Sequence, residues 1–241
     1  QYMKEIGEIV HQNGALFLVD TVTSLGGEEV KIDEWGIDAA FSATQKCLSV
    51  PPGLSPVTLN EKAMQRVRER KAKSWYFDLR MMEKYWSGEQ KRKYHHTAPV
   101  NMNFALYEAL RIILEEGLEK RYARHKNNHL ALIAGLEAMG LRMVVAEEKR
   151  LWPLNTVYIP GGVQDSVVRK LLLDIFNLEI GGGLGAFKGK VWRIGLMGES
   201  CTLNNVLLCL EALEFALAKT GISLAPGVGV AAALAKASEL H

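Results

Sequence analysis

The sequence predicts an α/β protein in which a mixed sheet is followed by a smaller α+β domain. The residues from Ala15 to Asp20 and from Asp38 to Ser42 form short, mostly apolar runs that are too short for ordinary helices. We therefore expect two strands here, the first buried on both faces as in a parallel sheet. Further along, helix-period stretches alternate with short apolar runs, which favours a sheet packed against helices.

The first half of the chain predicts helices, strands and one long irregular segment. The expected helices span residues 1–11 and 60–70, the second capped by Asn60. The expected strands span residues 15–20, 38–42 and 54–59, with Pro56 a mark against a central position for the last. Residues 71–99 are rich in aromatic side chains without periodicity, which suggests a functional or subunit-contact loop.

The second half predicts long helices and a small sheet. Gly117 separates a helix over 102–116 from one over 118–139. Strands are expected at 141–146, 154–159, 178–181 and 190–196, and helices at 164–177, 202–219 and, weakly, 231–240. The helix 202–219 carries an apolar stripe that indicates a core face. We expect a domain boundary between residues 1–119 and residues 120–241.

Composition bounds the class of protein. The 241 residues are 48% hydrophobic and 23% charged, and 29 Lys+Arg against 27 Asp+Glu leave a net charge of +2. This balance argues against a nucleic-acid or membrane surface as the main partner. Three unpaired cysteines and the lack of a membrane span or signal peptide make the cytoplasm the default expectation. The chain begins inside a predicted helix without an initiator methionine, so we expect a piece of a longer polypeptide.

Two polar side chains follow the first two predicted strands. Asp20 ends one strand, and Lys46 lies shortly after the other. The carboxyl ends of parallel strands face the crevice where ligands bind in open α/β sheets. An acid there can keep a ring nitrogen protonated and an amine can form a Schiff base with an aldehyde, and pyridoxal phosphate needs both. By spacing alone, solvated loop residues are the commoner explanation.

Several motifs carry a family resemblance. They are Leu16–Gly27, Gly36-Ile37-Asp38, Ser42-Ala43-Thr44-Gln45-Lys46, Pro51-Pro52-Gly53, Tyr94-His95-His96-Thr97, Gly181–Gly185 and Arg193-Ile194-Gly195-Leu196. In this order they closely resemble the class V aminotransferases, and among them the alanine–glyoxylate and serine–pyruvate group, over residues 1 to about 218. The resemblance implies fold type I with a partial large domain, pyridoxal 5'-phosphate as cofactor, small amino acids and 2-oxo acids as substrates, and a homodimer with shared active sites. It implies no metal.

The resemblance also implies roles for individual residues. Lys46 is the expected catalytic residue, because it holds the cofactor and then moves the substrate proton. The expected cofactor-binding residues are Asp20 at the ring nitrogen, Val22 on the ring face, and Gln45, Tyr94 and Thr97 at the phosphate, the last two reaching the neighbouring subunit's site. Arg193 is expected to bind the substrate carboxylate. A surface lysine and a structural ion pair remain the alternatives for Lys46 and Arg193.

Three other signals carry less weight. The glycine run 181–185 lacks the Lys-Ser/Thr pair and the helix of a phosphate loop, so a tight turn is the better interpretation. His125 and His129 have the spacing of zinc proteases but lack their glutamate. Cys47 suggests a sulfur-transfer nucleophile, but desulfurases usually carry histidine where Gln45 stands.

The sequence thus predicts transamination between alanine or serine and glyoxylate. The alternatives are a related transaminase acting on aminoethylphosphonate or hydroxykynurenine, a lyase of the same fold, or an inactive fragment that only binds or dimerises.

Overall fold

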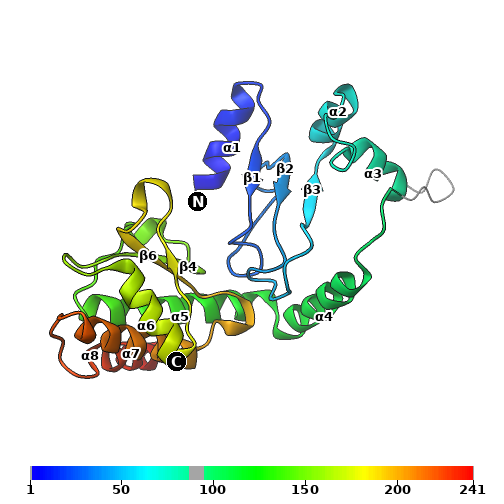
Figure 1. Ribbon diagram of the computed structural model, residues 1–241. Helices are drawn as coiled ribbons and strands as arrows, with labels where there is room; N and C mark the ends of the chain where they lie inside the picture. Colours follow the sequence, from blue (N-terminus) through cyan, green and yellow to red (C-terminus); the bar gives the residue numbers. More distant parts are fainter. Residues whose placement is uncertain (1, 87–94, 241) are drawn as a thin grey trace. The chain divides into compact units, whose positions relative to one another are not determined.

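The computed structural model describes residues 2–86 and 95–240, and the chain divides into two compact units. The first unit comprises residues 1–22, 30–45 and 50–110, and the second comprises residues 23–29, 46–49 and 111–241. Figure 1 labels the helices and strands of both units. Two short segments of the amino-terminal half, 23–29 and 46–49, therefore belong to the second unit.

The first unit is built on a three-stranded mixed sheet. Strand β1 (Leu18–Asp20) pairs in parallel with β2 (Ala39–Phe41), and β2 pairs in antiparallel with β3 (Val57–Leu59). Helix α1 (Tyr2–Gln12) contributes Met3 and Val10 to a small core around Phe17, Ile37 and Ala40. The predicted mixed sheet is thus present, with strands shorter than the sequence suggested.

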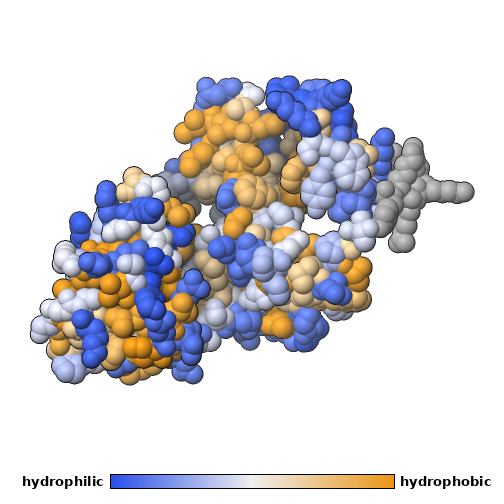
Figure 2. All heavy atoms as spheres, in the orientation of Figure 1, coloured by the Kyte–Doolittle hydropathy of each residue, from blue (hydrophilic) through white to orange (hydrophobic). Residues whose placement is uncertain are grey.

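One expectation about the first strand was wrong. Phe17 is 7% exposed, but Leu18 is 64% exposed and Leu16 is 38% exposed, so the strand region is buried on one face only. Successive side chains of a strand point to opposite faces, and the apolar cluster around Phe17 covers one of them. Figure 2 shows apolar atoms at the surface of this unit in the region of α1 and β1.

Two helices follow β3 in the first unit. Helix α2 (Glu61–Glu69) begins where predicted, and the Asn60 side chain accepts a hydrogen bond from the Ala63 N–H. Helix α3 (Leu79–Trp86) lies inside the segment that we expected to be irregular. Arg68 of α2 donates to Glu83 of α3, and this long-range ion pair is invisible to a search for periodicity within one segment.

The second unit packs a small antiparallel sheet against helices. Its strand order is β4 (Leu154–Tyr158), β6 (Val191–Gly195), β5 (Gly181–Gly182). The helices are α5 (Leu118–Ala138), α6 (Asp165–Phe176), α7 (Leu203–Lys219) and α8 (Val228–Glu239). Helix α4 (Val100–Glu116) precedes α5 and is separated from it by Gly117, whose φ of 82° favours glycine. The predicted apolar stripe of α7 faces the core, with Leu210, Leu213 and Leu217 fully buried.

The strand predicted at 141–146 is absent. Only Met143 pairs, in an isolated bridge to Val157, and the chain then enters a 3₁₀ turn, η1 (Glu147–Lys149). Two further 3₁₀ turns lie at η2 (Gly185–Phe187) and η3 (Gly198–Ser200). Two backbone hydrogen bonds join the segment to β4, from the Val144 N–H to the Thr156 carbonyl oxygen at 3.0 Å and from the Tyr158 N–H to the Arg142 carbonyl oxygen at 2.9 Å, and Leu141 and Met143 pack on the core.

The predicted boundary between residues 119 and 120 stays a prediction.

No helix within residues 2–86 and 95–240 is long and apolar enough to cross a membrane.

The core of the second unit generates a stability prediction. Leu210 is fully buried, and a Cβ added at Gly135 of α5 would lie 2.3 Å from its side chain, so the two helices pack closely there. Leu210→Ala should lower the free energy of unfolding by about 2–5 kcal/mol, because a cavity remains. The matched control is Leu208→Ala on the same helix, where the side chain is 41% exposed and the loss should stay below about 1 kcal/mol. Urea unfolding of both variants measures the difference, and equal losses would contradict this account of the core.

Candidate functional site

The carboxyl ends of β1 and β2 lie together in the first unit, as the sequence predicts. Asp20, the last residue of β1, is in register with Phe41, the last residue of β2. Beyond the strands, the Thr21 hydroxyl donates to the Phe41 carbonyl oxygen at 2.8 Å and the Ser42 hydroxyl donates to the Thr21 carbonyl oxygen at 3.2 Å. The segments that leave the two strands are therefore tied to each other.

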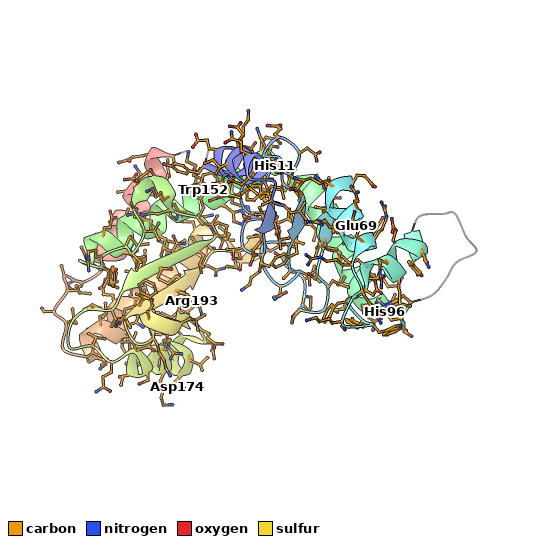
Figure 3. All side chains as sticks on the ribbon, turned by 90° about the horizontal axis from the view of Figure 1, so that it is seen from above. His11, Glu69, His96, Trp152, Asp174 and Arg193 are labelled. Atoms are coloured by element: carbon orange, nitrogen blue, oxygen red, sulfur yellow. The ribbon has the colours of Figure 1, made fainter. Side chains whose placement is uncertain are left out.

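Asp38 holds the opposite end of this strand pair. Its buried carboxylate accepts hydrogen bonds from the Phe17 N–H at 2.7 Å and the Asn60 amide at 2.8 Å, and it lies 2.9 Å from His11 Nε2. Burial alone would raise the pKa of Asp38, but these hydrogen bonds outweigh it and lower the pKa. Figure 3 labels His11 in α1. Asp38 is therefore a structural acid that fixes the start of β2 and so the place where Asp20 ends β1.

Asp20 offers a carboxylate at the sheet edge. One oxygen, Oδ1, accepts a hydrogen bond from the Val22 N–H at 2.8 Å, which orders the two residues that follow the strand. Among the described residues no cation forms an ion pair with it. The other carboxylate oxygen, Oδ2, has no hydrogen bond among the described residues.

Lys46 belongs to the second unit and begins a tight turn. The Ser49 N–H donates to the Lys46 carbonyl oxygen at 2.9 Å, and Ser49 has a φ of 61°, uncommon for a residue with a side chain. The Lys46 side chain is half-buried. Within the described parts of the chain its amine has no hydrogen bond or ion pair, so it differs from a lysine engaged in a structural contact.

Arg121 of α5 holds the turn that follows Lys46. This guanidinium is fully buried and donates to two backbone carbonyl oxygens, that of Cys47 at 2.8 Å and that of Gly26 at 2.9 Å. Its remaining contacts are carboxylates, Glu116 at 2.6 Å and Glu199 at 2.8 Å. A sequence search for sites missed Arg121, because its backbone acceptors lie far away in the chain.

The next turn of α5 continues this network. Arg124 makes a two-point contact with Glu116 and also donates to the carbonyl oxygens of Gly198 and Cys201. Arg124, followed by Arg121, lowers the pKa of Glu116 to about 2 although burial opposes this. His125 is fully buried, and its Nδ1 donates to the Arg121 carbonyl oxygen while its Nε2 accepts from the Gly198 N–H at 3.0 Å. Both contacts require the neutral imidazole, and burial lowers the pKa of His125 accordingly.

Arg193 lies in the central strand β6 of the second unit (Figure 3). Its Nε donates to the Gly182 carbonyl oxygen at 2.8 Å, and Gly181 pairs directly opposite it in β5. A Cβ added at Gly181 would lie 3.3 Å from the Arg193 Nη2, so a glycine gives the guanidinium room. No carboxylate among the described residues pairs with Arg193, and its two terminal nitrogens are available for a planar anion.

The structure describes all of the other predicted site residues except Tyr94. Val22 is half-buried and Gln45 exposed, both in the first unit, and Thr97 is exposed just before α4. Tyr94 lies outside the described residues. The neighbouring His95 is buried, stacks on Trp75 with ring centroids 4.3 Å apart, and has its Nδ1 2.8 Å from the His96 Nδ1. Both histidines are thus engaged in contacts within the first unit.

The signals that carried less weight have structural partners. The Cys47 thiol is buried and donates to the Thr23 carbonyl oxygen, and burial raises its pKa to about 12, which disfavours a thiolate nucleophile. His129 bonds to the Asn155 side chain at 2.6 Å, while His125 is engaged as above. In the described residues no group of three or more His, Cys, Asp and Glu is arranged to hold a metal. Of the glycine run, Gly183 is required sterically, since a Cβ there would lie 2.0 Å from the Phe187 carbonyl oxygen.

Comparison with known proteins places this arrangement in a family. The family model described as aminotransferase class V matches residues 1–183. The chain is 42% identical to the (S)-ureidoglycine–glyoxylate transaminase of Bacillus subtilis, over 96% of the chain and 60% of that relative. It is 41% identical to the alanine–glyoxylate aminotransferase of Mus musculus, over 90% of the chain and 53% of that relative.

Solved structures agree with the sequence relatives. The crystal structure of the ureidoglycine–glyoxylate aminotransferase from Bacillus subtilis matches with a TM-score of 0.92 at 44% identity, covering 98% of the chain and 61% of that structure. The alanine–glyoxylate aminotransferase of Nostoc sp. matches with a TM-score of 0.84 at 46% identity, covering 88% of the chain and 56% of that structure. The chain thus spans roughly half to three-fifths of the length of the relatives it matches.

The fold is that of the fold type I pyridoxal-phosphate-dependent aminotransferases. The chain belongs to the class V aminotransferase family, and pyridoxal phosphate is the cofactor that membership implies. The resemblance seen in the sequence motifs is therefore confirmed, together with the predicted fold class.

Buried His125 generates a prediction about how the stability of the protein depends on pH. Its folded-state pKa lies below the unfolded value of about 6.5, so the unfolded chain binds the proton more tightly. The stability that neutral His125 contributes is present above about pH 6.5 and is lost as the pH falls below it. In His125→Asn the free energy of unfolding should therefore depend less steeply on pH between about 5 and 7 than in the parent chain. Urea unfolding across this range measures both slopes, and identical slopes would refute the assignment.

Proposed function

We propose that this chain carries the lysine-bearing part of a pyridoxal-phosphate-dependent transaminase that uses glyoxylate as amino acceptor. The observation that carries the proposal is that Lys46, which the resemblance to the family suggests as the catalytic lysine, is half-buried and its amine has no hydrogen bond or ion pair among the described residues. Glyoxylate appears in the names of both the Bacillus subtilis and the Mus musculus relatives, which supports it as the shared substrate.

The residues present fit the cofactor chemically. Pyridoxal phosphate, when bound, draws electrons away from the α-carbon of an amino acid and so makes the proton there acidic. Lys46 would hold the cofactor through its Nζ and, once the substrate amine has displaced it, would accept the α-carbon proton at that nitrogen. The Asp20 carboxylate would face the protonated ring nitrogen, because an ionised acid beside a cation stabilises both charges.

Four further side chains would complete the cofactor contacts. Val22 follows Asp20 directly and would pack on one face of the ring, where a β-branched side chain gives rigid contact. Gln45 and Thr97 would donate hydrogen bonds to the phosphate, and so would Tyr94. In the family pattern Tyr94 and Thr97 serve the neighbouring subunit, so we also propose a homodimer with shared sites.

Arg193 would bind the carboxylate that amino donors and 2-oxo acids share. Its Nε is already held by the Gly182 carbonyl oxygen, and this contact fixes the plane of the guanidinium before substrate arrives. Two parallel hydrogen bonds from the terminal nitrogens match the two oxygens of a carboxylate. Arg193 could therefore bind the amino acid in one half-reaction of a transamination and the 2-oxo acid in the other, because both carry a carboxylate.

The amino donor divides two candidate reactions. Alanine or serine is the donor that the sequence motifs predict, and the similarity to the alanine–glyoxylate aminotransferases of Mus musculus and Nostoc sp. supports alanine. (S)-Ureidoglycine is a second candidate, supported by the similarity to the Bacillus subtilis protein over nearly the whole chain. Glycine formation from glyoxylate with each donor in turn discriminates between them.

Lys46 generates the first functional prediction. Borohydride reduction after addition of pyridoxal phosphate should leave a pyridoxyl adduct on the peptide that contains Lys46, detected by mass spectrometry. Lys46→Ala should lose this adduct and all measurable transamination. The control is Lys170→Ala, which removes an exposed lysine paired with Asp174 and should keep both. An adduct confined to other lysines of the parent chain would refute the proposed site.

Arg193 generates the second. Arg193→Gln should lower kcat/KM by about 10- to 100-fold, mainly through KM, because a charged hydrogen-bonded contact is worth about 1.5–3 kcal/mol. Arg169→Gln is the matched control, since Arg169 is bound by Asp165 and should leave KM unchanged. A loss of kcat with unaltered KM would assign Arg193 to another step.

A further inference from the structure

The backbone that follows Lys46 is held from one side by a buried charge. Arg121 donates from Nη2 to the Cys47 carbonyl oxygen at 2.8 Å and from Nε to the Gly26 carbonyl oxygen at 2.9 Å. Segments 23–29 and 46–49 thus share one guanidinium within the second unit. The Cys47 thiol ties the same two segments together through its contact with the Thr23 carbonyl oxygen at 3.2 Å.

The other end of the turn is held by the loop after β6. The Glu199 N–H donates to Ser49 Oγ at 2.9 Å, and the Ser49 N–H closes the turn on the Lys46 carbonyl oxygen. Gly198 must be a glycine for this approach, because its φ is 60° and a Cβ there would lie 1.8 Å from Ser49 Oγ. Ser49 itself adopts a φ of 61°, so the turn persists only because its surroundings fix it.

The contacts of Arg121 with the Cys47 carbonyl oxygen and of the Glu199 N–H with Ser49 belong to one connected hydrogen-bond network. The Glu199 carboxylate accepts from Arg121 Nη1 at 2.8 Å, while its backbone N–H binds Ser49. Arg124 and His125 bind the carbonyl oxygen and the N–H of Gly198. The loop that binds Ser49 is therefore itself bound by three polar side chains of α5, Arg121, Arg124 and His125.

If Arg121 served only in a structural ion pair, its hydrogen bonds to two backbone carbonyl oxygens would not be needed. Glu116 alone would neutralise Arg121, and it is already bound by Arg124. Two of the Arg121 nitrogens instead donate to neutral carbonyl oxygens, one of them that of Cys47, the residue that follows Lys46. The Lys46 amine has no hydrogen bond or ion pair among the described residues. The backbone alone therefore sets the point from which the Lys46 side chain extends.

We infer that Arg121 is a positioning residue that fixes the Lys46–Ser49 turn and so sets the place of the Lys46 amine for cofactor attachment. The inference rests on the proposed function for the role of Lys46. Arg121 touches neither cofactor nor substrate in this account, and its effect travels through the Cys47 carbonyl oxygen and through Glu199.

The experiment compares Arg121→Lys, Arg121→Gln and Ser49→Ala with the parent chain. Lysine keeps the charge but lacks the fork that reaches both carbonyl oxygens. Ser49→Ala removes the second hold at an exposed position, so this variant keeps its fold even if an Arg121 variant does not. Arg150→Gln is the matched control, because Arg150 of the same unit binds Val145 and Glu137 and neither held segment.

Two measurements are made on each folded variant. Amide hydrogen exchange of the peptide covering residues 46–50 should rise about tenfold or more in the Arg121 and Ser49 variants, with α7 peptides unchanged. The rate of borohydride-trapped pyridoxyl adduct formation on Lys46 should fall about 10- to 100-fold, since small misplacements of a reacting group have effects of this size. Arg150→Gln should match the parent in both measurements.

The outcomes separate this inference from the proposed function. Faster exchange together with slower trapping supports Arg121 as a positioning residue. Unchanged exchange at residues 46–50, or faster exchange with parental trapping, overturns it while the trapped parent still supports the proposed function. Absence of any Lys46 adduct in the parent chain refutes the proposed function and the positioning role with it.

Discussion

The buried guanidinium of Arg121 is the interaction on which the second unit depends most. A charge with no exposed surface is tolerated only when its donors are satisfied, and here two carbonyl oxygens and two carboxylates do so. Removing one partner of such a buried pair destabilises a protein by about 3–5 kcal/mol in general. Arg121 of α5 therefore needs the carbonyl oxygens of segments 23–29 and 46–49, and these segments are in turn held in place by its hydrogen bonds.

The groups that we assign to chemistry differ from those that we assign to structure in how well they are satisfied. Asp38, Arg121, Arg124 and His125 each have several hydrogen-bond partners, and each fixes a neighbouring segment. Lys46 and the terminal nitrogens of Arg193 have none among the described residues. An unpartnered cation beside a well-bonded network is what a site for an anionic or carbonyl ligand requires, since the ligand itself supplies the missing partner.

Much of the fold could be predicted from the sequence because its signals are local. Asn60 as the cap of α2, Gly117 between α4 and α5 and the apolar stripe of α7 each depend on residues a few positions apart. The position of Asp20 at the end of β1 could also be predicted, because the apolar run ends at this carboxylate. The network around Arg121 could not, because its carbonyl acceptors at Gly26 and Cys47 lie 95 and 74 residues away and leave no trace in side-chain chemistry. The strand expected at 141–146 is only a short antiparallel bridge to β4, made by Met143 and two backbone hydrogen bonds of Arg142 and Val144, because the chain turns away into η1 after it.

The interleaving of the two units limits how this molecule can be divided. The chain passes from one unit to the other after residues 22, 29, 45, 49 and 110, so neither unit is a continuous stretch of sequence. A polypeptide that began at residue 111 would carry Arg121 without the Gly26 and Cys47 carbonyl oxygens that accept two of its hydrogen bonds. In recombination or gene fusion, the carboxy-terminal stretch therefore keeps these two hydrogen bonds only if it travels with segment 23–29 and with segment 46–49, which begins with Lys46 itself.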